Sequence, residues 1–496
     1  MEPRYRFGPL ERRGIWFGRD QSEVAVLLCG AALFLAGYLL HLGLVALLFP
    51  ALAFVLAFLP IRGRSLSKWT PLLGSYLGRR LRGRHLWRSR APHAGHLYVE
   101  KTRQLEPRQH RPECLRTVEM LMAHSADDPT LTWGVVHDTA ARTYGVTLKA
   151  WGHDFALLDL AEQAQRIEAW ASVIASYARK SAVDVVQWTE RIVPDGGEGV
   201  GRYLRERFQS HQGHDAARAS YLQLVEQDAP AAQRHEVLLT LTISERGWLK
   251  QMRRAGAGDI ERGACAMLLS EADHLRRLLE GAEITTEPLL TPRQYARELR
   301  VAYDPTLRRR RDAIEREGGA VGSHPANAWP RRLQEHLDCI EADGYWHRSY
   351  WVAEWPRIDV GPNFLSPLLL QTHGLRAVTL VMKPQPTAQA VQDYRRALMS
   401  VEADRRDRER AGFTDTAIHR AEQAQVEKLG EELADGHVVV RFSGYVTVSA
   451  ESEEALNVES QAVEQLASQC HLDLERKDSE QALTMTYTLP LGRGVA

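Results

Sequence analysis

The most pronounced feature of the hydrophobic pattern is an uncharged, apolar run from Val24 to Ile61. A membrane-spanning helix needs about 20 apolar residues to cross roughly 30 Å of hydrocarbon, so this run suits two short spans better than one. Residues suited to a tight turn lie near its middle, at Tyr38, His41 and Gly43. The pattern predicts a helical membrane hairpin with arms Val24–Tyr38 and Leu42–Ile61, because backbone groups in lipid must be satisfied internally.

The flanks of the apolar run predict its orientation. A signal peptide would have one shorter apolar region and a cleavage site of small residues, and a core helix is rarely apolar on every face. Arginine is frequent on both sides of the run, and the first acid after it is Glu100. Basic residues close to a span stay cytoplasmic. We therefore expect a multi-pass protein of the inner (cytoplasmic) membrane with both termini in the cytoplasm.

The segment Arg62–Arg90 interleaves arginine with leucine, tyrosine and tryptophan. This pattern predicts a basic amphipathic segment in the headgroup layer, where each Lys or Arg contributes about 1 kcal/mol against anionic lipid. A nucleic-acid patch and a plain linker are the alternatives, and adjacency to the apolar run favours lipid. The residues expected to contact the membrane surface are Arg62, Arg64, Lys68, Trp69, Arg79, Arg80, Arg82, Arg84 and Trp87.

Strand and helix patterns follow in the first 190 residues beyond this segment. Thr132–His137 and Thr143–Ala150 are β-rich and flank a four-residue turn, which predicts a hairpin. Asp159 opens a capping box for a helix that runs to about Arg179. The other expected elements are strands Val183–Ile192 and Glu236–Ser244 and helices Gly201–Glu226 and Gly258–Gly281. The order ββαβαβα predicts a mixed sheet with helices on one side.

The chain from Tyr345 onward has a second set of strand patterns, after an irregular stretch that includes Arg308–Arg311 and a short helix that Thr291 could cap. Thr387–Glu432 is helical in pattern, charged on every side at its middle, and expected to break near Gly412 into an antiparallel pair. The other expected elements are helix Ser452–Gln469 and strands Tyr345–Trp355, Arg376–Met382, Val438–Ser449, His471–Glu475 and Ala482–Leu489. This order resembles the ferredoxin fold.

The expected fold class is α+β, with an N-terminal two-helix membrane hairpin followed by two cytoplasmic α/β sandwich blocks, the second ferredoxin-like. The expected segments are a cytoplasmic N-terminal segment 1–22, the two-span membrane hairpin 23–61, a basic juxtamembrane segment 62–95, the first block 96–284, a linker or insertion 285–344 and the second block 345–496.

The sequence offers no catalytic, cofactor-binding or metal site. A P-loop is absent because the dipeptide Gly-Lys never occurs, and the histidines lack companions at ligand spacing. Five cysteines are scattered without CxxC spacing, which fits a reducing compartment. Lys and Arg balance Asp and Glu at 63 each, so the overall charge gives no reason to expect nucleic-acid binding. We therefore expect a non-enzyme without cofactors and without direct sequence-specific nucleic-acid binding.

Two regions carry a family resemblance. The run GPLERRG, the apolar hairpin and the basic segment that follows it together resemble PrgI-type components of conjugation machines. The C-terminal half resembles the non-motor N-terminal domain of TraC-type transfer ATPases, and actinobacterial proteins that join the two parts are also similar. The matching residues of the C-terminal half are Leu433, Arg441, Val446, Val448, Leu456, Leu489, Pro490, Leu491, Gly492 and Arg493.

The resemblance implies a membrane-anchored scaffold of a type IV secretion-like conjugative apparatus. The family's ATP-binding residues have no counterpart here, so the expected partner is a separately encoded motor ATPase within a multi-subunit complex. The C-terminal block and the charged stretch Ala403–Gly412 are the expected contacts with that motor. An EccE-like subunit of a type VII secretion complex is the alternative, and a membrane-bound enzyme ranks last because no DxD motif or other site is visible.

Overall fold

The computed structural model describes residues 7, 21–41, 43–61, 64–89, 111–125, 128, 130–152, 158–179, 181–194, 216, 219–220, 223, 233–308, 328–371, 374–410 and 417–495. Nearly all of the expected helix Gly201–Glu226, nearly all of the N-terminal segment and part of the expected linker lie outside these residues.

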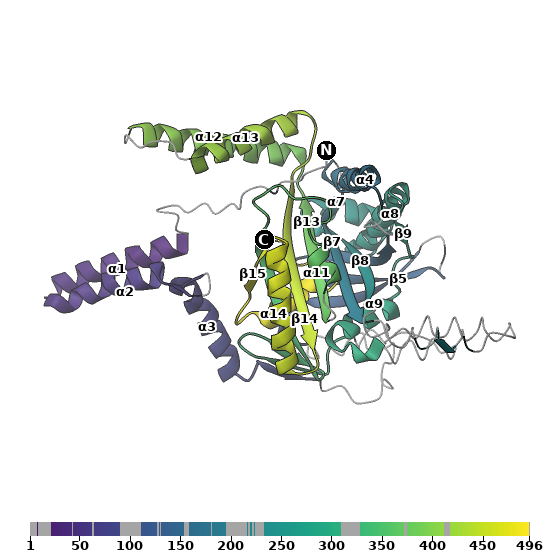
Figure 1. The fold of residues 1–496 in the computed structure, drawn as a ribbon, viewed down its shortest axis with the longest axis horizontal. Coiled ribbons are helices and arrows are strands. Elements are labelled where there is room, and N and C mark those ends of the chain that lie inside the picture. The colour runs from purple at the N-terminus through teal and green to yellow at the C-terminus, as the bar shows by residue number, and fades with distance from the viewer. Residues whose placement is uncertain are drawn as a thin grey trace.

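A 13-stranded antiparallel sheet forms the body of the molecule (Figure 1). Its strand order is β3-β10-β11-β12-β14-β13-β7-β8-β6-β5-β4, with β15 also paired to β12 and β9 to β6. The strands of the first half are β4 (Val118–His124), β5 (Thr132–Asp138), β6 (Thr143–Trp151), β7 (Val183–Pro194), β8 (Gln233–Ser244) and β9 (Thr285–Thr286). Those of the second half are β10 (Arg332–Glu335), β11 (Ile340–Ala342), β12 (Tyr345–Glu354), β13 (Leu375–Pro384), β14 (Val440–Ala450) and β15 (Asp473–Arg476), and β3 (Leu86–Arg88) extends the edge.

The sheet is built from two copies of one topology. In the first half β6, helix α4 (Leu160–Ala178), β7, β8, helix α8 (Ile260–Gly281) and β9 follow one another, and the strands lie in the order β9-β6-β8-β7. In the second half β12, helix α11 (Ser366–Leu370), β13, β14, helix α14 (Glu453–Gln469) and β15 repeat this pattern, in the order β15-β12-β14-β13. Each half is therefore a βαββαβ unit of the ferredoxin-like kind, preceded by one further hairpin.

The two units meet edge to edge through β7 and β13. These strands pair antiparallel, with Thr189 opposite Thr379, so a pseudo-two-fold axis passes between the two threonines. The expected fold class, with two separate sandwich blocks, is therefore wrong, because the blocks share one continuous sheet.

The two faces of the sheet differ in what covers them. One face packs under α4, α8 and α14, with helix α7 (Glu245–Ala255) beside α8, and forms two apolar cores centred on Leu241 and Val446. The other face packs under helices α9 (Pro292–Tyr303) and α15 (Gln481–Met485) and the turns η4 (Glu113–Leu115) and η8 (Thr486–Thr488). Helix α9 begins with a complete capping box between Thr291 and Gln294, as the sequence predicts for Thr291. The expected strand Ala482–Leu489 is wrong, because this segment is α15 followed by η8.

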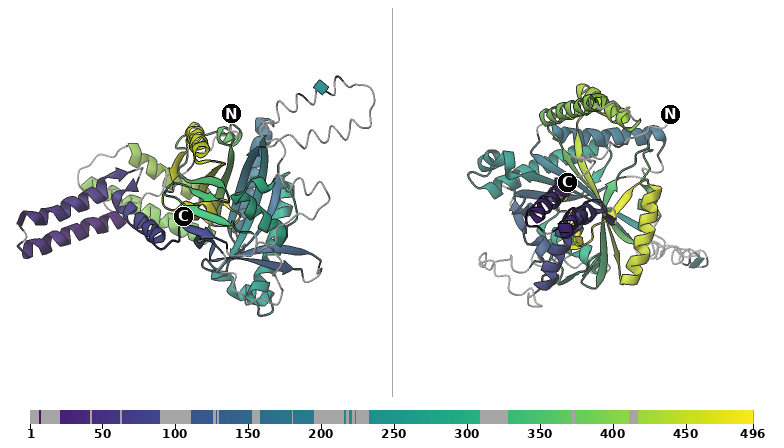
Figure 2. Two further views of the ribbon diagram at one scale, coloured as in Figure 1. Left: turned by 90° about the horizontal axis from the view of Figure 1, so that it is seen from below. Right: turned by 90° about the vertical axis from the view of Figure 1, so that its left-hand side faces the viewer.

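The apolar run forms helix α1 (Gln21–Leu39), the 3-10 turn η1 (Gly43–Leu47) and helix α2 (Leu48–Phe58), which extend away from the sheet (Figures 1 and 2). The short strands β1 (Pro60–Ile61) and β2 (Arg64–Ser65) lead into helix α3 (Leu66–Leu81). Within the described part of the chain, no helix has both the length and the apolarity needed to cross a membrane. Helix α2 has 11 residues and is therefore about 16 Å long, against roughly 30 Å of hydrocarbon. The predicted membrane hairpin and multi-pass inner-membrane location are therefore wrong.

A second helical projection leaves the sheet between β13 and β14. Helices α12 (Thr387–Arg410) and α13 (Ala417–Ala434) form an antiparallel arm, and the break that the sequence predicts near Gly412 falls between them, outside the described residues. The arm and the α1–α2 hairpin extend to the same side of the molecule (Figures 1 and 2). Since α1 and α2 expose many large apolar side chains and the arm exposes mainly charged ones, the two projections offer different surfaces.

Candidate functional site

A buried row of polar side chains crosses the sheet on the face opposite α8 and α14. Within the first half, the hydroxyls of Thr147 and Thr240 lie 2.8 Å apart on neighbouring strands. The hydroxyl of Thr379 donates to that of Thr189 over 3.1 Å across the pseudo-two-fold axis. Within the second half, the hydroxyls of Ser349 and Thr447 lie 2.9 Å apart. Buried polar groups are stable only when hydrogen-bonded, so this row fixes the register of both units.

Residues 487–494 lie over the middle of this row. Gln187, fully buried on β7, donates to the carbonyls of Leu489 (2.7 Å) and Tyr487 (3.2 Å) and accepts from the Gly492 amide (2.6 Å). The hydroxyl of Tyr445 donates to the Gly494 carbonyl over 2.5 Å. The motif LPLGRG, which the sequence singles out by resemblance, therefore connects the two units.

Arg493 anchors the same segment to the first half. Its guanidinium donates to Asp138 (2.7 Å), to the Cys114 carbonyl (2.9 Å) and to the Thr117 hydroxyl (2.8 Å). Burial acts to raise the pKa of Asp138, but Arg493 and the hydrogen bonds outweigh it and hold that pKa below its ordinary value. The pair is therefore ionised near neutral pH and links residues 355 positions apart.

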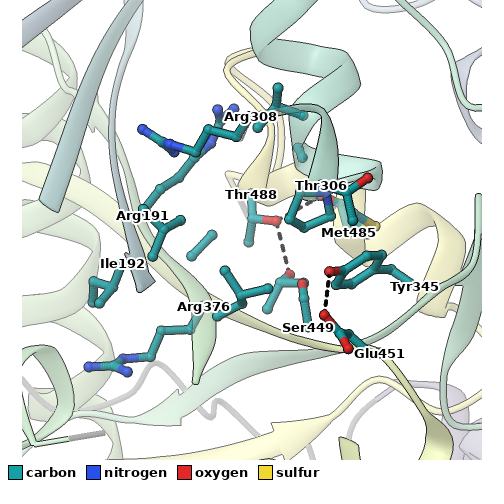
Figure 3. A pocket seen from close by; sticks show the side chains of 17 residues that line it. Arg191, Ile192, Thr306, Arg308, Tyr345, Arg376, Ser449, Glu451, Met485 and Thr488 are labelled. Atoms are coloured by element: carbon teal, nitrogen blue, oxygen red, sulfur yellow. Dashed lines mark hydrogen bonds between the residues drawn. The ribbon is translucent and has the colours of Figure 1, made fainter. Parts of the chain in front are cut away.

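A cavity lies beside this segment, between the C-terminal end of α9 and strands β7, β12, β13 and β14 (Figure 3). Its volume is about 190 Å³, similar to the roughly 150 Å³ that accommodates benzene in an engineered core. Ile192, Leu375 and Met485 give it apolar walls, and Tyr345 and Glu451 close one end with a 3.0 Å hydrogen bond. A space of this size is sufficient for a small apolar group.

The arginines around the cavity turn their charges away from its centre (Figure 3). Arg191 donates to Glu298 over 2.9 Å, and Arg376 donates to the carbonyls of Leu368 (2.9 Å) and Leu369 (2.7 Å). Burial lowers the pKa of Arg376 to about 10, so it stays charged near neutral pH. These groups are engaged in structure and do not form a cradle for an anionic ligand.

Ser449, which lines the cavity, is in hydrogen-bond contact with a buried histidine. The Ser449 hydroxyl lies 2.8 Å from Nδ1 of His347, and Nε2 of His347 lies 3.2 Å from the Tyr303 carbonyl. A carbonyl only accepts, so Nε2 has the proton and Nδ1 accepts from Ser449. Burial lowers the pKa of His347 to about 4, which makes it a weak base. The pair has the contact of a nucleophile and its base, but lacks the basicity that would activate the serine.

A buried ionic cluster lies behind the cavity on α9. The carboxylate of Glu298 contacts Lys149 (2.9 Å), Arg191 (2.9 Å) and Arg297 (3.0 Å). Burial acts to raise the pKa of Glu298, but the three cations outweigh it and hold that pKa far below its ordinary value. The cluster joins α9 to β6 and β7, and sequence reasoning missed it because its members come from distant elements.

Neither thiols nor metal ligands form a site in the described ranges. Burial raises the pKa of Cys114, Cys265 and Cys339 to about 12 in each case, so these thiols stay protonated at neutral pH. No group of three or more His, Cys, Asp or Glu side chains among the described residues is placed to hold a metal ion.

The residues expected at a membrane surface have different surroundings. Arg79 forms a 3.1 Å ion pair with Glu335 and donates to the Ser479 carbonyl, while Trp87 of β3 packs into the core under α9. Arg84 forms a 3.2 Å ion pair with Glu113, and Trp69 is buried. Lys68 is half-buried, Arg80 and Arg82 are exposed, Arg64 lies in β2 and Arg62 lies outside the described residues. The structure therefore does not bring this set together on one face, and contact with anionic lipid stays a prediction.

Comparison with known proteins gives no match, either to a protein-family model or to a curated protein sequence.

Proposed function

We propose that this chain is a non-catalytic scaffold subunit of a type IV secretion-like conjugative transfer apparatus, and that it docks a separately encoded motor ATPase. Two arguments support the proposal. The C-terminal half resembles the non-motor domain of TraC-type transfer ATPases. Polar and ionisable groups around the cavity beside residues 487–494, including Arg191, Arg376 and Glu451, are engaged in structural contacts.

The observation that carries the docking proposal is the arm α12–α13. Its helices of 24 and 18 residues leave the sheet between two adjacent strands and extend beyond the body (Figure 1). Ion pairs one helical turn apart stabilise each helix, including Arg406 with Glu402 (2.8 Å) and Lys428 with Glu432 (3.7 Å). Such pairs contribute only about 0.3–0.5 kcal/mol each, so the charges remain available to a partner. A charged helical projection suits recognition of a charged surface on a separate protein.

The test is co-purification of the full chain with the motor ATPase encoded beside it. Replacing Arg405 and Arg406 by glutamate reverses two adjacent charges on the arm, and we expect motor binding to weaken by about tenfold or more. Binding of the unaltered chain should also fall as salt rises, because charge attraction between exposed groups decays over about 8 Å at physiological ionic strength.

The matched control replaces Arg253 and Arg254, two adjacent exposed arginines on α7, by glutamate. This control should bind the motor like the unaltered chain. The docking proposal fails if the motor does not bind, or if the arm variant binds as well as the control variant. Co-purification of EccB-, EccC- and EccD-like proteins in place of a conjugation motor would favour the type VII alternative.

A further inference from the structure

The internal duplication makes the two outer edges of the sheet comparable. Strand β4 precedes β5 and β6 in the first half as β10 precedes β11 and β12 in the second. In the second half, β3 covers the outer side of β10 through the pairs Arg332 with Arg88, Leu333 with Trp87 and Gln334 with Leu86. In the first half, no described strand covers the outer side of β4. The two repeats thus differ at this edge: β10 is paired on its outer side, whereas β4 has no described strand beside it there.

The hydrogen bonds of β4 identify which backbone groups face the open side. The Thr139 amide donates to the Thr117 carbonyl (2.8 Å), and the Ser125 amide donates to the Leu131 carbonyl (3.0 Å), so odd-numbered residues of β4 bond to β5. Even-numbered residues therefore direct their amide and carbonyl groups outward, since pairing alternates along an antiparallel strand. Arg111 donates to the outward carbonyl of Val118. Among the described residues, none bonds the backbone of Met120 or Met122.

The sequence of this edge does not protect it from pairing. Natural edge strands avoid association through proline, lysine, bulges or very short length. Strand β4 has seven residues, Val-Glu-Met-Leu-Met-Ala-His, with no proline and no lysine. The side chain of Met122 is 59 % exposed. Methionine adapts its shape to apolar partners, so the edge presents both free backbone groups and an apolar side chain to an incoming strand.

We propose that β4 is a self-association edge, which pairs antiparallel with β4 of a second copy of this chain. With Leu121 on the two-fold axis, Met120 of each copy lies opposite Met122 of the other, and the outward amide and carbonyl groups of these two residues find partners. Met120 and Met122 of both copies lie on one face of the paired strands, where Met122 is exposed and Met120 also packs against the core under α9. Glu119 faces Ala123 of the other copy, so like charges do not meet across the axis.

The molecule already contains an interface of this kind. Strands β7 and β13 join the two units antiparallel about a pseudo-two-fold axis, so edge-to-edge pairing already occurs in this fold, at the edge of each unit opposite to β4 and β10. A two-fold contact is also the commonest way for identical chains to associate. A seven-residue strand spans only about 23 Å, so we expect a concentration-dependent dimer and not a permanent one.

The register gives a charge-swap experiment on the full chain. In the variant Met120→Lys with Met122→Lys, lysines face lysines across the axis, and we expect the dimer dissociation constant to rise by about tenfold or more. In the variant Met120→Lys with Met122→Glu, each lysine faces a glutamate and the dimer should return. The matched control is Met399→Lys, since Met399 is 63 % exposed on the arm and should leave the dimer unchanged.

Light scattering coupled to size-exclusion chromatography over a range of concentrations measures the dimer, and circular dichroism confirms that each variant is folded. Hydrogen exchange provides a second readout on the unaltered chain, because the amides of Met120 and Met122 should be protected at high concentration and exchange freely on dilution. The proposal is refuted by a chain that is monomeric at every concentration, or by a dimer whose stability the double-lysine change leaves intact. Failure of the Lys–Glu variant to restore the dimer would refute the register. Capture of another protein at β4, without a dimer, would refute the choice of a second copy as occupant.

Discussion

Replacing Gln187 by leucine should be among the most destabilising single changes in the chain. Gln187 is fully buried and is held by four hydrogen bonds, including the 2.6 Å bond that it accepts from the Gly492 amide. Leucine fills a similar volume, so the change removes these bonds without leaving a large cavity. The Gly492 amide loses the Gln187 side-chain oxygen that accepts its hydrogen bond, which lowers the free energy of unfolding by about 1–3 kcal/mol. Each other lost hydrogen bond lowers it by about 0.5–1.5 kcal/mol. We therefore expect a loss of about 3–5 kcal/mol in the free energy of unfolding.

Urea denaturation followed by circular dichroism measures this loss. The control is Gln251→Leu, because Gln251 is exposed on α7 and its replacement should change stability by no more than about 0.5 kcal/mol. Trypsin provides a local readout, since Arg493 is held against Asp138 and should become cleavable when the segment is released. Equal stability of the two variants, together with unchanged cleavage at Arg493, would refute the view that Gln187 holds the two units and the segment together.

Two further changes test other parts of the core. Burial lowers the pKa of His347 to about 4 from an ordinary value of 6.5, so the unfolded chain binds a proton more readily. Stability should be full above about pH 6.5 and fall by up to about 3 kcal/mol as the pH drops to 4, and His347→Gln should lose this dependence in urea titrations at several pH values. In Gly263→Ala, the added methyl would overlap the Met252 carbonyl where α8 crosses α7, so thermal unfolding should occur at a clearly lower temperature. Gly281→Ala on the same helix meets open space and should not show this loss; equal melting temperatures would contradict the close crossing.

Local signals in the sequence predict many of the elements. The hairpin β5–β6 and the helix caps at Asp159 and Thr291 follow from residue types a few positions apart, and all three are confirmed. The arm likewise follows from a charged helical pattern interrupted near Gly412. These features depend on interactions within one turn or one hairpin, which a single sequence displays directly.

Features that depend on distant partners could not be predicted in this way. Arg79 looks like a membrane-surface residue until Glu335, 256 positions away, is seen to pair with it. Trp87 likewise looks like a membrane-surface residue in the sequence, but in the structure it lies in β3 opposite Leu333 of β10. The apolar run suggested a membrane hairpin because its total length was counted, whereas its second arm is divided between η1 and an α2 of 11 residues. A run of hydrophobic residues does not report where a helix is interrupted.

The duplication was missed although a weak signal for it exists. In each half a long connection precedes a threonine-containing strand, β8 or β14, and a long helix follows that strand, after the additional helix α7 in the first half. The residues on the two strands differ, so the repeat is visible in topology and not in a shared motif. The duplication is therefore recognised from the order of helices and strands in the two halves and not from their amino-acid residues.

The position of residues 487–494 has a consequence for how the chain reaches its native state. Gln187 and Asp138 are synthesised about 300 to 350 residues before the groups that satisfy them, namely the Gly492 amide and the Arg493 guanidinium. At a synthesis rate of about 5–20 residues per second, the centre of the sheet waits for its last partners for tens of seconds. Contacts this far apart in sequence also slow folding, because loop closure must precede any gain from them. Both repeats therefore pass through a period in which Gln187 and Asp138 lack these partners, and the docking of residues 487–494 joins β5 and β7 to the segment of the chain that is made last.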